Sequence, residues 1–472
     1  MNCAMTRSLQ ADYLVVGAGA MGMAFTDALI DHADVRVAVV DRRPSAGGHW
    51  LDAYPFVRLH QASAFYGVAS TPLGGGIQSY GPEAGLYERA TMPEICAYFG
   101  HVLNDRMVQS GRVDFLANCE YLSDRRIVSH ISGQRFEVSP RCRIVDARYL
   151  APDIPASTPA PFEVDADTQV IPVNELARIG DAPSQFVIVG SGKTATDACI
   201  WLLAHGVDVA AICWVRPREP WMLNRAVAQP DPAVFLGMAA DTMVAAADAT
   251  SLPDFFLRLE DAGIMLRIDR SVMPTMAKAP TLAGWELELL RSLENVVRLG
   301  HVRRVGSGRL TLEHGEVAIA RDALVVHCAA SGLQNPPLVP IWGPSAITLQ
   351  PIRAGYPCFG AALAGYVEAT RRTDARDGNH DPHDAEKNRL CPPTPYGNSL
   401  AQWAAMTLLG ARATMAFGSE PDIKAWADSV ALNPARVPPE QERSAALVDA
   451  LSRLQAGLPG GLNRLSELVQ TG

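Results

Sequence analysis

The sequence predicts an α/β protein with two similar parallel-sheet domains and a helical C-terminal region, and three observations lead to this fold class. A glycine-rich turn stands between a short apolar run and a helix-like segment near residue 17, and the same arrangement recurs once near residue 190. Proline crowds residues 152–172, which we expect to link two domains because they cannot form regular helix or central strand. Residues 411–472 have the apolar spacing of helices.

The first glycine turn has the features of a dinucleotide site. Tyr13 to Val16 should form a buried strand, and Gly17, Gly19 and Gly22 follow it with G-x-G-x-x-G spacing. In such a turn the first glycine lets the chain turn sharply, the second lets the backbone approach a pyrophosphate, and the third lets the helix pack on the sheet. The helix N-terminus offers free N–H groups to the phosphates. This pattern predicts a Rossmann-like domain, although a lone glycine motif also occurs in other α/β proteins.

An acidic residue after the next strand supports the dinucleotide interpretation. Residues 35–40 should form the second strand, and Asp41 ends it. A carboxylate there can accept hydrogen bonds from an adenosine ribose and repels a 2′-phosphate, so FAD or NAD fits the first site better than NADP. We place Arg42 in the same site.

The second glycine turn repeats the pattern after the apolar run 186–189. Gly190, Gly192 and Ala195 have the spacing G-x-G-x-x-A. The letters GSGKT also suggest a nucleoside-triphosphate loop, but that motif needs a glycine where Val187 stands inside the strand. We therefore interpret the turn as a second dinucleotide site, with Lys193 and Thr194 at the start of its helix.

Arginines follow the second strand of this unit, where the first unit has an aspartate. Arg216 and Arg218 come directly after residues 209–215. Arginine can pair bidentately with a 2′-phosphate and so favours NADPH over NADH. The alternative is that both arginines, and Lys193 beside the turn, are ordinary solvated or structural charges.

Composition argues against several other classes of protein. The formal net charge is −9 with a pI of about 5.7, and no block of like charges suggests a nucleic-acid or anionic-membrane surface. No apolar run has membrane-spanning length and the first strand leaves no room for a signal peptide, so we expect a cytoplasmic protein. The nine cysteines include no C-x-x-C pair, which argues against a dithiol relay and against a metal site.

These features divide the chain into four segments. We expect a first dinucleotide domain at residues 9–178, a second inserted at 179–320, a return to the first at 321–410, and a helical extension at 411–472 that covers a substrate cavity or makes a homodimer contact. The expected elements are a helix capped by Thr91 at 91–109, short strands at 113–145, helices at 231–299 and a hairpin at 309–320. His380 and His383 lie in a polar stretch that we interpret as a charged loop and not as a metal site.

Three stretches resemble flavin-containing monooxygenases and Baeyer–Villiger monooxygenases, the class B flavoprotein monooxygenases. They are GGHW at 47–50 with Tyr54-Pro55, Ser63 and Tyr66; WVRPREPWMLNR at 214–225; and ARDALVVHCAASGL at 320–333, where Asp322, Ala330, Ser331 and Gly332 fall on a family pattern.

The resemblance implies FAD in the first site and NADPH in the second. It implies that Gly48, His49, Trp50 and Ser63 lie near the isoalloxazine, and that the segment with Ser331 and Gly332 returns the chain to the FAD domain. The family often has an aspartate where this chain has His60 or Gln61, and these two are our candidate catalytic residues. The family fingerprint F-x-G-x-x-x-H is absent, because residues 161–174 hold Phe162 without the glycine or the histidine.

Two nucleotide units without a dithiol between them imply hydride transfer from NADPH to FAD. By resemblance, the reduced flavin would then react with O2 and, as a C4a-(hydro)peroxide, oxygenate a small-molecule nucleophile at nitrogen, sulfur or a ketone. The alternatives are a flavin-dependent NADPH reductase or dehydrogenase without oxygen insertion, a single-component flavin halogenase, and a sensor or scaffold that only binds dinucleotides.

Overall fold

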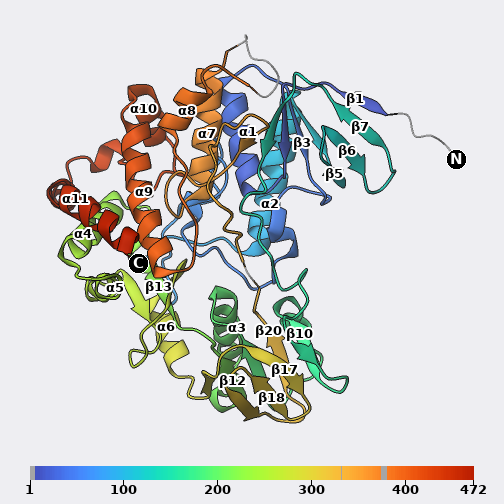
Figure 1. The fold of residues 1–472 in the computed structure, drawn as a ribbon, viewed down its shortest axis with the longest axis vertical. Coiled ribbons are helices and arrows are strands. Elements are labelled where there is room, and N and C mark those ends of the chain that lie inside the picture. Colours follow the sequence, from blue (N-terminus) through green and yellow to red (C-terminus); the bar gives the residue numbers. More distant parts are fainter. Residues whose placement is uncertain (1–5, 331, 374–379, 472) are drawn as a thin grey trace.

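The computed structural model describes residues 6–330, 332–373 and 380–471. They form two α/β bodies, one above the other in Figure 1, with a group of helices along one side. None of the helices in these ranges is long and apolar enough to cross a membrane.

The first body is built on a five-stranded parallel sheet in the order β21-β8-β2-β3-β4. Its strands are β2 (Tyr13–Val16), β3 (Val37–Val40), β4 (Val113–Leu116), β8 (Arg143–Asp146) and β21 (Ile347–Thr348). Helices α1 (Ala20–His32) and α7 (Pro357–Arg371) pack against one another on one face. The other face carries a small sheet of β1 (Arg7–Leu9), β7 (Arg135–Val138), β6 (Arg126–Ser129) and β5 (Cys119–Tyr121). Because both faces are covered, β2 and β3 are apolar throughout.

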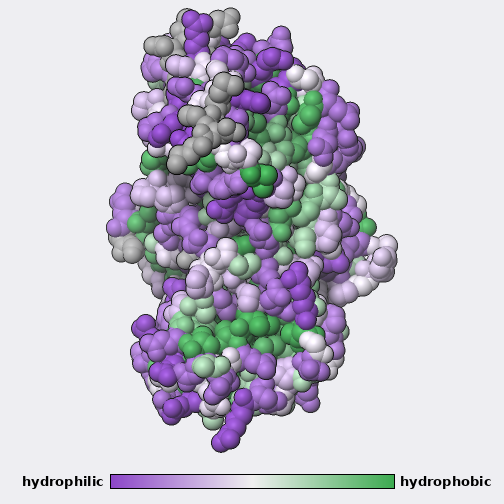
Figure 2. All heavy atoms as spheres, turned by 90° about the vertical axis from the view of Figure 1, so that its right-hand side faces the viewer, coloured by the Kyte–Doolittle hydropathy of each residue, from purple (hydrophilic) through white to green (hydrophobic). Residues whose placement is uncertain are grey.

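The second body repeats this plan with the parallel order β10-β20-β11-β12-β16. Its strands are β10 (Gln169–Pro172), β11 (Phe186–Val189), β12 (Ile212–Val215), β16 (Val296–Val297) and β20 (Leu324–His327). Helices α3 (Lys193–Ala204) and α6 (Gly284–Arg291) pack on one face, and the other carries β9 (Glu163–Val164), β17 (Val302–Gly306), β18 (Arg309–Leu312) and β19 (Gly315–Ala318). In Figure 2 a band of apolar side chains crosses this lower body.

The two expected boundaries around the second domain need correction. β10 lies before residue 179 and β20 lies after residue 320, yet both are strands of the second sheet, where β20 pairs with β10 on one side and with β11 on the other. The chain therefore crosses between the bodies at residues 147–162 and, among the described residues, at 328–330 and 332–346. A bridge joins these crossings, since Asp153 N donates to Gly332 O (3.0 Å) and Gly332 N donates to Asp153 O (3.2 Å).

The stretch expected to be helical at 231–299 is only partly so. α4 (Pro232–Asp248), α5 (Leu252–Asp261) and α6 are helices, but β14 (Met265–Arg267) and β15 (Met276–Leu282) form a three-stranded sheet with β13 (Pro220–Asn224). The expectation of strands at 113–145 is confirmed, with β4 and β8 in the main sheet and β5 to β7 in the small one. The hairpin at 309–320 is confirmed as β18 and β19.

The helical C-terminal region is confirmed, and it begins earlier than expected. It comprises α8 (Asp384–Leu390), α9 (Leu400–Gly418), α10 (Pro421–Ser429) and α11 (Ala445–Thr471). α11 lies along α4 of the second domain segment and contacts α9, while α8 and α10 contact α7 of the first body, so this group of helices packs beside the first body (Figure 1).

The helix expected at 91–109 is α2 (Met92–His101), which continues as a π-helical turn to Met107 and a 3₁₀ turn to Ser110. Thr91 and Glu94 form the expected cap, with Thr91 N donating to Glu94 Oε2 (2.7 Å). Short 3₁₀ turns occur elsewhere, among them η1 (Gly48–Asp52), η2 (Ser63–Phe65) and η7 (Arg225–Val227).

Candidate functional site

The first glycine turn lies at the carboxyl edge of the first sheet and leaves a helix N-terminus uncapped. Gly17 has φ +107°, and a Cβ on Gly22 would overlap the carbonyl oxygen of Gly17, so glycine is required at both positions. Gly19 precedes α1 without a side-chain cap. A Cβ on Gly48 would come 2.9 Å from Gly19 Cα, so the turn and the segment after β3 approach backbone to backbone. Such an uncapped turn fits a pyrophosphate.

Asp41 lies where the ribose acid is expected and also fixes the turn. Its Oδ2 accepts a hydrogen bond from Ala18 N (2.7 Å), and its Oδ1 accepts one from Arg43 N (2.9 Å). Each carboxylate oxygen has a second acceptor position, so the side chain can still accept ribose hydroxyls.

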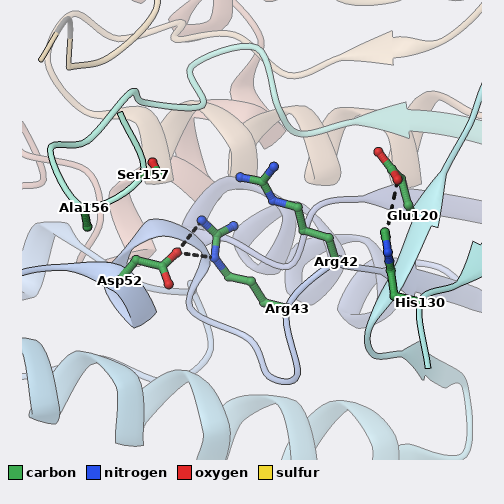
Figure 3. Close-up of a pocket in the computed structure, with 7 residues that line it drawn as sticks. All are labelled: Arg42, Arg43, Asp52, Glu120, His130, Ala156 and Ser157. Carbon is green, nitrogen blue, oxygen red and sulfur yellow. Dashed lines mark hydrogen bonds and ion pairs between the residues drawn. The ribbon is translucent and has the colours of Figure 1, made fainter. Parts of the chain in front are cut away.

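A pocket of about 460 Å³ opens beside Asp41. Figure 3 shows Arg42 between two polar pairs, Arg43 with Asp52 (2.7 Å) and His130 with Glu120 (3.3 Å). Ala156 and Ser157, from the crossing segment, complete the wall. The pocket has the position and polarity for the adenosine end of a dinucleotide bound at the turn.

The predicted segment 47–66 packs tightly against the first body. Trp50 is buried, and its Nε1 donates to Tyr66 Oη (2.6 Å). Burial and the nearby Arg43 lower the pKa of His49 to about 4, so its imidazole is neutral. Ser63 Oγ accepts a hydrogen bond from Ala90 N (2.8 Å) and is buried. Ser63 therefore ties two segments of the first body together.

The second glycine turn matches the first. Gly190 has φ +143°, and a Cβ there would come 3.3 Å from the backbone of Cys328. Gly192 precedes α3 without a side-chain cap, and the space where its Cβ would lie is open. Trp214 Nε1 donates to Gly190 O (2.8 Å) and holds the turn in place. Thr194 is half-buried in the first turn of α3.

Lys193, at the start of α3, forms ion pairs with two carboxylates. Its buried ammonium group pairs with Asp197 on the same helix and lies 3.6 Å from Glu286 Oε1. The i, i+4 spacing of Lys193 and Asp197 explains this orientation, because both side chains lie on one face of α3.

Arg216 lines a second pocket of about 460 Å³. Its guanidinium group pairs with Glu219 and lies 4.5 Å from the Trp214 ring, while its Nε has no hydrogen-bond partner. Burial lowers the Arg216 pKa to about 10, so the group stays charged at neutral pH. Further charged residues line the same pocket: Asp269, Arg270, Arg291 and Arg298.

The other predicted arginine, Arg218, is exposed and lies outside this pocket; its backbone N donates to Ser191 Oγ (3.4 Å). Arg218 lies near Lys278, whose pKa falls to about 8 through burial and the charge of Arg218. Sequence reasoning missed Lys278 and the three further arginines of the pocket, because they are scattered over residues 270–298 and no local motif connects them.

A network of buried ion pairs joins the two bodies. The first body contributes Glu83 and Arg89, and the second contributes Arg225 and Glu286 together with the Lys193–Asp197 pair. Arg225 is fully buried and pairs with Glu83 across the junction, and its second terminal nitrogen donates to Glu286 Oε2 (2.7 Å). Arg89 pairs with Glu83 (2.7 Å), and Tyr54 Oη donates to Asp197 Oδ2 (2.7 Å). Three cations face three carboxylates, so the network is balanced in charge.

His60 lies at this junction, and its backbone is held from both bodies. The Thr281 hydroxyl donates to His60 O, and Arg225 Nε donates to Thr281 Oγ1 (3.1 Å). Arg89 donates to the preceding carbonyl, Leu59 O (2.9 Å). Burial, followed by the charges of Lys193, Arg89 and Arg225, holds the His60 pKa well below its usual range. The imidazole is therefore neutral, and Gln61 beside it is half-buried.

The predicted return segment is a crossing between the bodies. Gly332 has φ +71° and forms the bridge to Asp153, which makes it a structural turn of the crossing. Ser331 lies outside the described residues. Asp322 accepts hydrogen bonds from the Ser184 hydroxyl (2.5 Å) and backbone N (3.0 Å). Within the described ranges no group of three or more His, Cys, Asp or Glu side chains could hold a metal ion.

Comparison with solved structures gives likenesses of low identity. They include a cyclohexanone monooxygenase from Rhodococcus bound to NADP+ (16% identity, TM-score 0.44, covering 97% of this chain and 98% of that one) and a flavin-containing monooxygenase from Stenotrophomonas maltophilia (12%, TM-score 0.42, 78% and 98%). An ornithine N-hydroxylase from Kutzneria has 14% identity and a TM-score of 0.42 over 70% of this chain and 82% of that one. These values are too low to transfer an activity.

Sequence comparison gives a domain and a family. The model of the NAD(P)-binding Rossmann-like domain matches residues 15–62, which span the first glycine turn and Asp41. Uncharacterized proteins of Mycobacterium tuberculosis and Mycobacterium bovis are 40% identical over 431 residues, which cover 90% of this chain and 78% of theirs. The chain therefore belongs to the same protein family as these mycobacterial proteins.

Proposed function

We propose that the protein is an NADPH-dependent flavoprotein monooxygenase that oxygenates a small-molecule nucleophile with O2. The observation that carries the proposal is the pair of uncapped glycine turns on two separate parallel sheets, whose bodies meet at His60 and the buried ion pairs. Ligands of such sheets bind at the carboxyl ends of the strands, so two dinucleotides bound here would extend toward the junction. The choice of oxygenation over electron transfer alone rests on the resemblance of residues 47–66 and 214–225 to the monooxygenases.

The residues of the first body fit FAD. The first turn of α1 offers backbone N–H groups to the pyrophosphate, and Asp41 offers free acceptor positions to the ribose. Arg42 and its pocket lie beside Asp41 at the adenosine end. Bound FAD would supply hydride acceptance and the reaction with oxygen, for which the protein provides orientation and electrostatics.

The residues of the second body fit NADPH. The open space at Gly192 and the uncapped start of α3 suit the pyrophosphate. Arg216 has an unpartnered Nε and shares its pocket with Arg270, Arg291 and Arg298, so this pocket has the charge for a 2′-phosphate. Glu219 and Asp269 now pair with Arg216 and Arg298, and a phosphate would compete with them for these guanidinium groups.

At the junction, His60 provides a neutral imidazole. Burial, followed by the charges of Lys193, Arg89 and Arg225, lowers the His60 pKa, so the neutral ring acts as a hydrogen-bond donor or acceptor in one tautomer. Thr281 and Arg89 fix the peptide on either side of the ring, which orients it without occupying its nitrogens. We propose that His60, with Gln61, positions the substrate and the reacting end of the cofactors.

A two-step mixing experiment tests the proposed oxygenation. The FAD-loaded protein is reduced with NADPH under anaerobic conditions and then mixed with oxygen while the flavin spectrum is recorded. A species distinct from reduced and oxidised flavin, together with transfer of ¹⁸O from O2 into an added amine or thioether, is the expected result. Immediate return to oxidised flavin with no labelled product in any substrate class would instead identify a reductase.

A further inference from the structure

Arg353 differs from the other buried cations of the described chain. The other six are all paired with carboxylates: Arg89, Arg143, Lys193, Arg216, Arg225 and Lys387. Arg353 is only 9% exposed, yet within the described ranges its side chain forms no ion pair or hydrogen bond, and its Nε is buried without a partner. A buried charge without a counter-charge is strongly disfavoured in a folded protein.

The surroundings of Arg353 are aromatic. The residue lies between the end of β21 and the start of α7, and its guanidinium carbon is 5.6 Å from the ring centroids of both Phe359 on α7 and Phe417 on α9. Trp426 of α10 stacks on Phe359 at 6.1 Å. Aromatic faces attract a guanidinium group. They do not, however, offer the two oxygen acceptors with which a carboxylate binds two guanidinium N–H groups at once.

Neighbouring acidic groups do not neutralise Arg353. Asp428 on α10 acts on it only through space, because its carboxylate is 40% exposed and pairs with Lys424 (2.6 Å). Burial raises the pKa of the Tyr356 hydroxyl, so this group stays uncharged. Burial lowers the pKa of Arg353 to about 10, which leaves it charged at neutral pH.

Two aromatic rings connect the segment of Arg353 with the segment that holds His60 and Gln61. Arg353 follows a strand of the first sheet at its carboxyl edge, where ligands of such sheets bind. Three residues later, the Tyr356 ring contacts Phe65 edge to face at 5.1 Å. Phe65 belongs to η2, directly after the segment that holds His60 and Gln61.

We propose that Arg353 anchors a subsite for the carboxylate of a small apolar molecule, with Phe359 and Phe417 as its walls. A carboxylate supplies the missing counter-charge and two acceptors that match the planar guanidinium fork, and the rings suit an apolar body. In a second step that rests on the proposed function, the bound acid is the substrate, whose sulfur, nitrogen or ketone is oxygenated.

A matched pair of compounds tests the subsite in the FAD-loaded protein. Para-(methylthio)benzoate and its neutral amide have the same shape, and their binding is measured by calorimetry and thermal shift without NADPH. We expect the acid to bind the natural protein at least about tenfold more tightly than the amide, as for one charge-assisted hydrogen-bonded pair. R353M should remove this preference, while R412M, at an exposed arginine of α9, should keep it.

The outcomes separate the subsite from the proposed function. Equal binding of acid and amide to the natural protein, or a preference that survives in R353M, would overturn the subsite. An equal thermal shift from chloride or inorganic phosphate would overturn the assignment to a carboxylate. If the acid binds through Arg353 but is not oxidised to its sulfoxide with NADPH and O2, the subsite stands and its role in the proposed reaction fails. Because the natural protein and the compound pair give the first comparison, the test does not depend on R353M folding.

Discussion

At the scale of single residues, the two dinucleotide turns depend on close backbone approach. Gly22 has no room for a side chain because the Gly17 carbonyl oxygen occupies that position. The equivalent position in the second unit is Ala195, which is fully buried, so the second turn accommodates a methyl group. The first turn is therefore the tighter of the two and the more sensitive to substitution.

We predict that G22A lowers stability by about 2 kcal/mol through overpacking and reduces FAD retention. Thermal unfolding and the flavin-to-protein absorbance ratio of the purified variant measure both effects. G100A, in the open surface of α2, is the matched control and should be neutral or slightly stabilising, because alanine favours helix. A G22A variant with natural stability and full flavin content would show that the turn is not packed as described.

Two histidines with lowered pKa values give a pH dependence of stability at the same scale. His49 and His60 both have pKa values below their unfolded value, His49 at about 4. The unfolded chain therefore binds protons that the folded chain does not, and their contribution is present above about pH 6.5 and lost as pH falls toward 4. We predict that the free energy of unfolding, measured by urea titration, decreases over this range, and that the decrease is smaller in H49N. An identical pH profile in H49N would contradict a lowered pKa for the His49 imidazole.

At the scale of elements, the long helix α11 joins the C-terminal region to the second domain segment through a close contact with α4. A Cβ on Gly461 would come 2.7 Å from the Met243 carbonyl oxygen, whereas one on Gly460 would make an ordinary contact at 3.6 Å with Ala247. Small residues on α11 thus allow the two helix backbones to approach.

We predict that G461A destabilises the protein by about 1 to 3 kcal/mol because the helices must separate, while G460A has little effect or is stabilising. Thermal unfolding of the two variants, with hydrogen exchange of α4 and α11, measures the difference. Equal stability of G461A and G460A would mean that α4 and α11 do not approach one another as closely as the structure shows.

At the scale of the whole molecule, the junction between the bodies depends on Arg225, which bonds to both Glu83 and Glu286. We predict that R225M leaves the buried network with one carboxylate more than its remaining cations, Arg89 and Lys193, can balance, and destabilises the protein by about 3 to 5 kcal/mol. Hydrogen exchange should increase around Glu83 and Thr281, on the two sides of the junction. R303M removes an exposed pair with Glu313 and should change stability by less than about 0.5 kcal/mol. Equal effects of the two substitutions would show that the network does not hold the bodies together.

The sequence was sufficient for features encoded within one unit. The strand, turn, helix and acid around Gly17 and Asp41 lie within 30 residues, and the cap formed by Thr91 and Glu94 is a local pattern. The sequence was insufficient for contacts between residues that are far apart in the chain. We expected residues 321–410 to return to the first sheet, whereas β20 pairs with β11 of the second sheet. Its apolar residues would fit a buried strand of either sheet, so the sequence does not identify the pairing partner. Arg298 and Arg216 share a pocket, and Lys193 turns toward Glu286, only because α6 and β16 pack beside α3 and β12.

The central claim is that two bound dinucleotides exchange a hydride, with Arg216 selecting the second. Its most direct test is anaerobic reduction of the bound FAD by NADPH and by NADH in the natural protein, in R216Q and in the exposed control R218Q. We predict reduction by both nucleotides, with an apparent Kd for NADPH that R216Q weakens by about 1 to 3 kcal/mol and R218Q changes little, while the value for NADH stays unchanged. No reduction of the flavin, or an equal loss for NADPH and NADH in R216Q, would contradict this account.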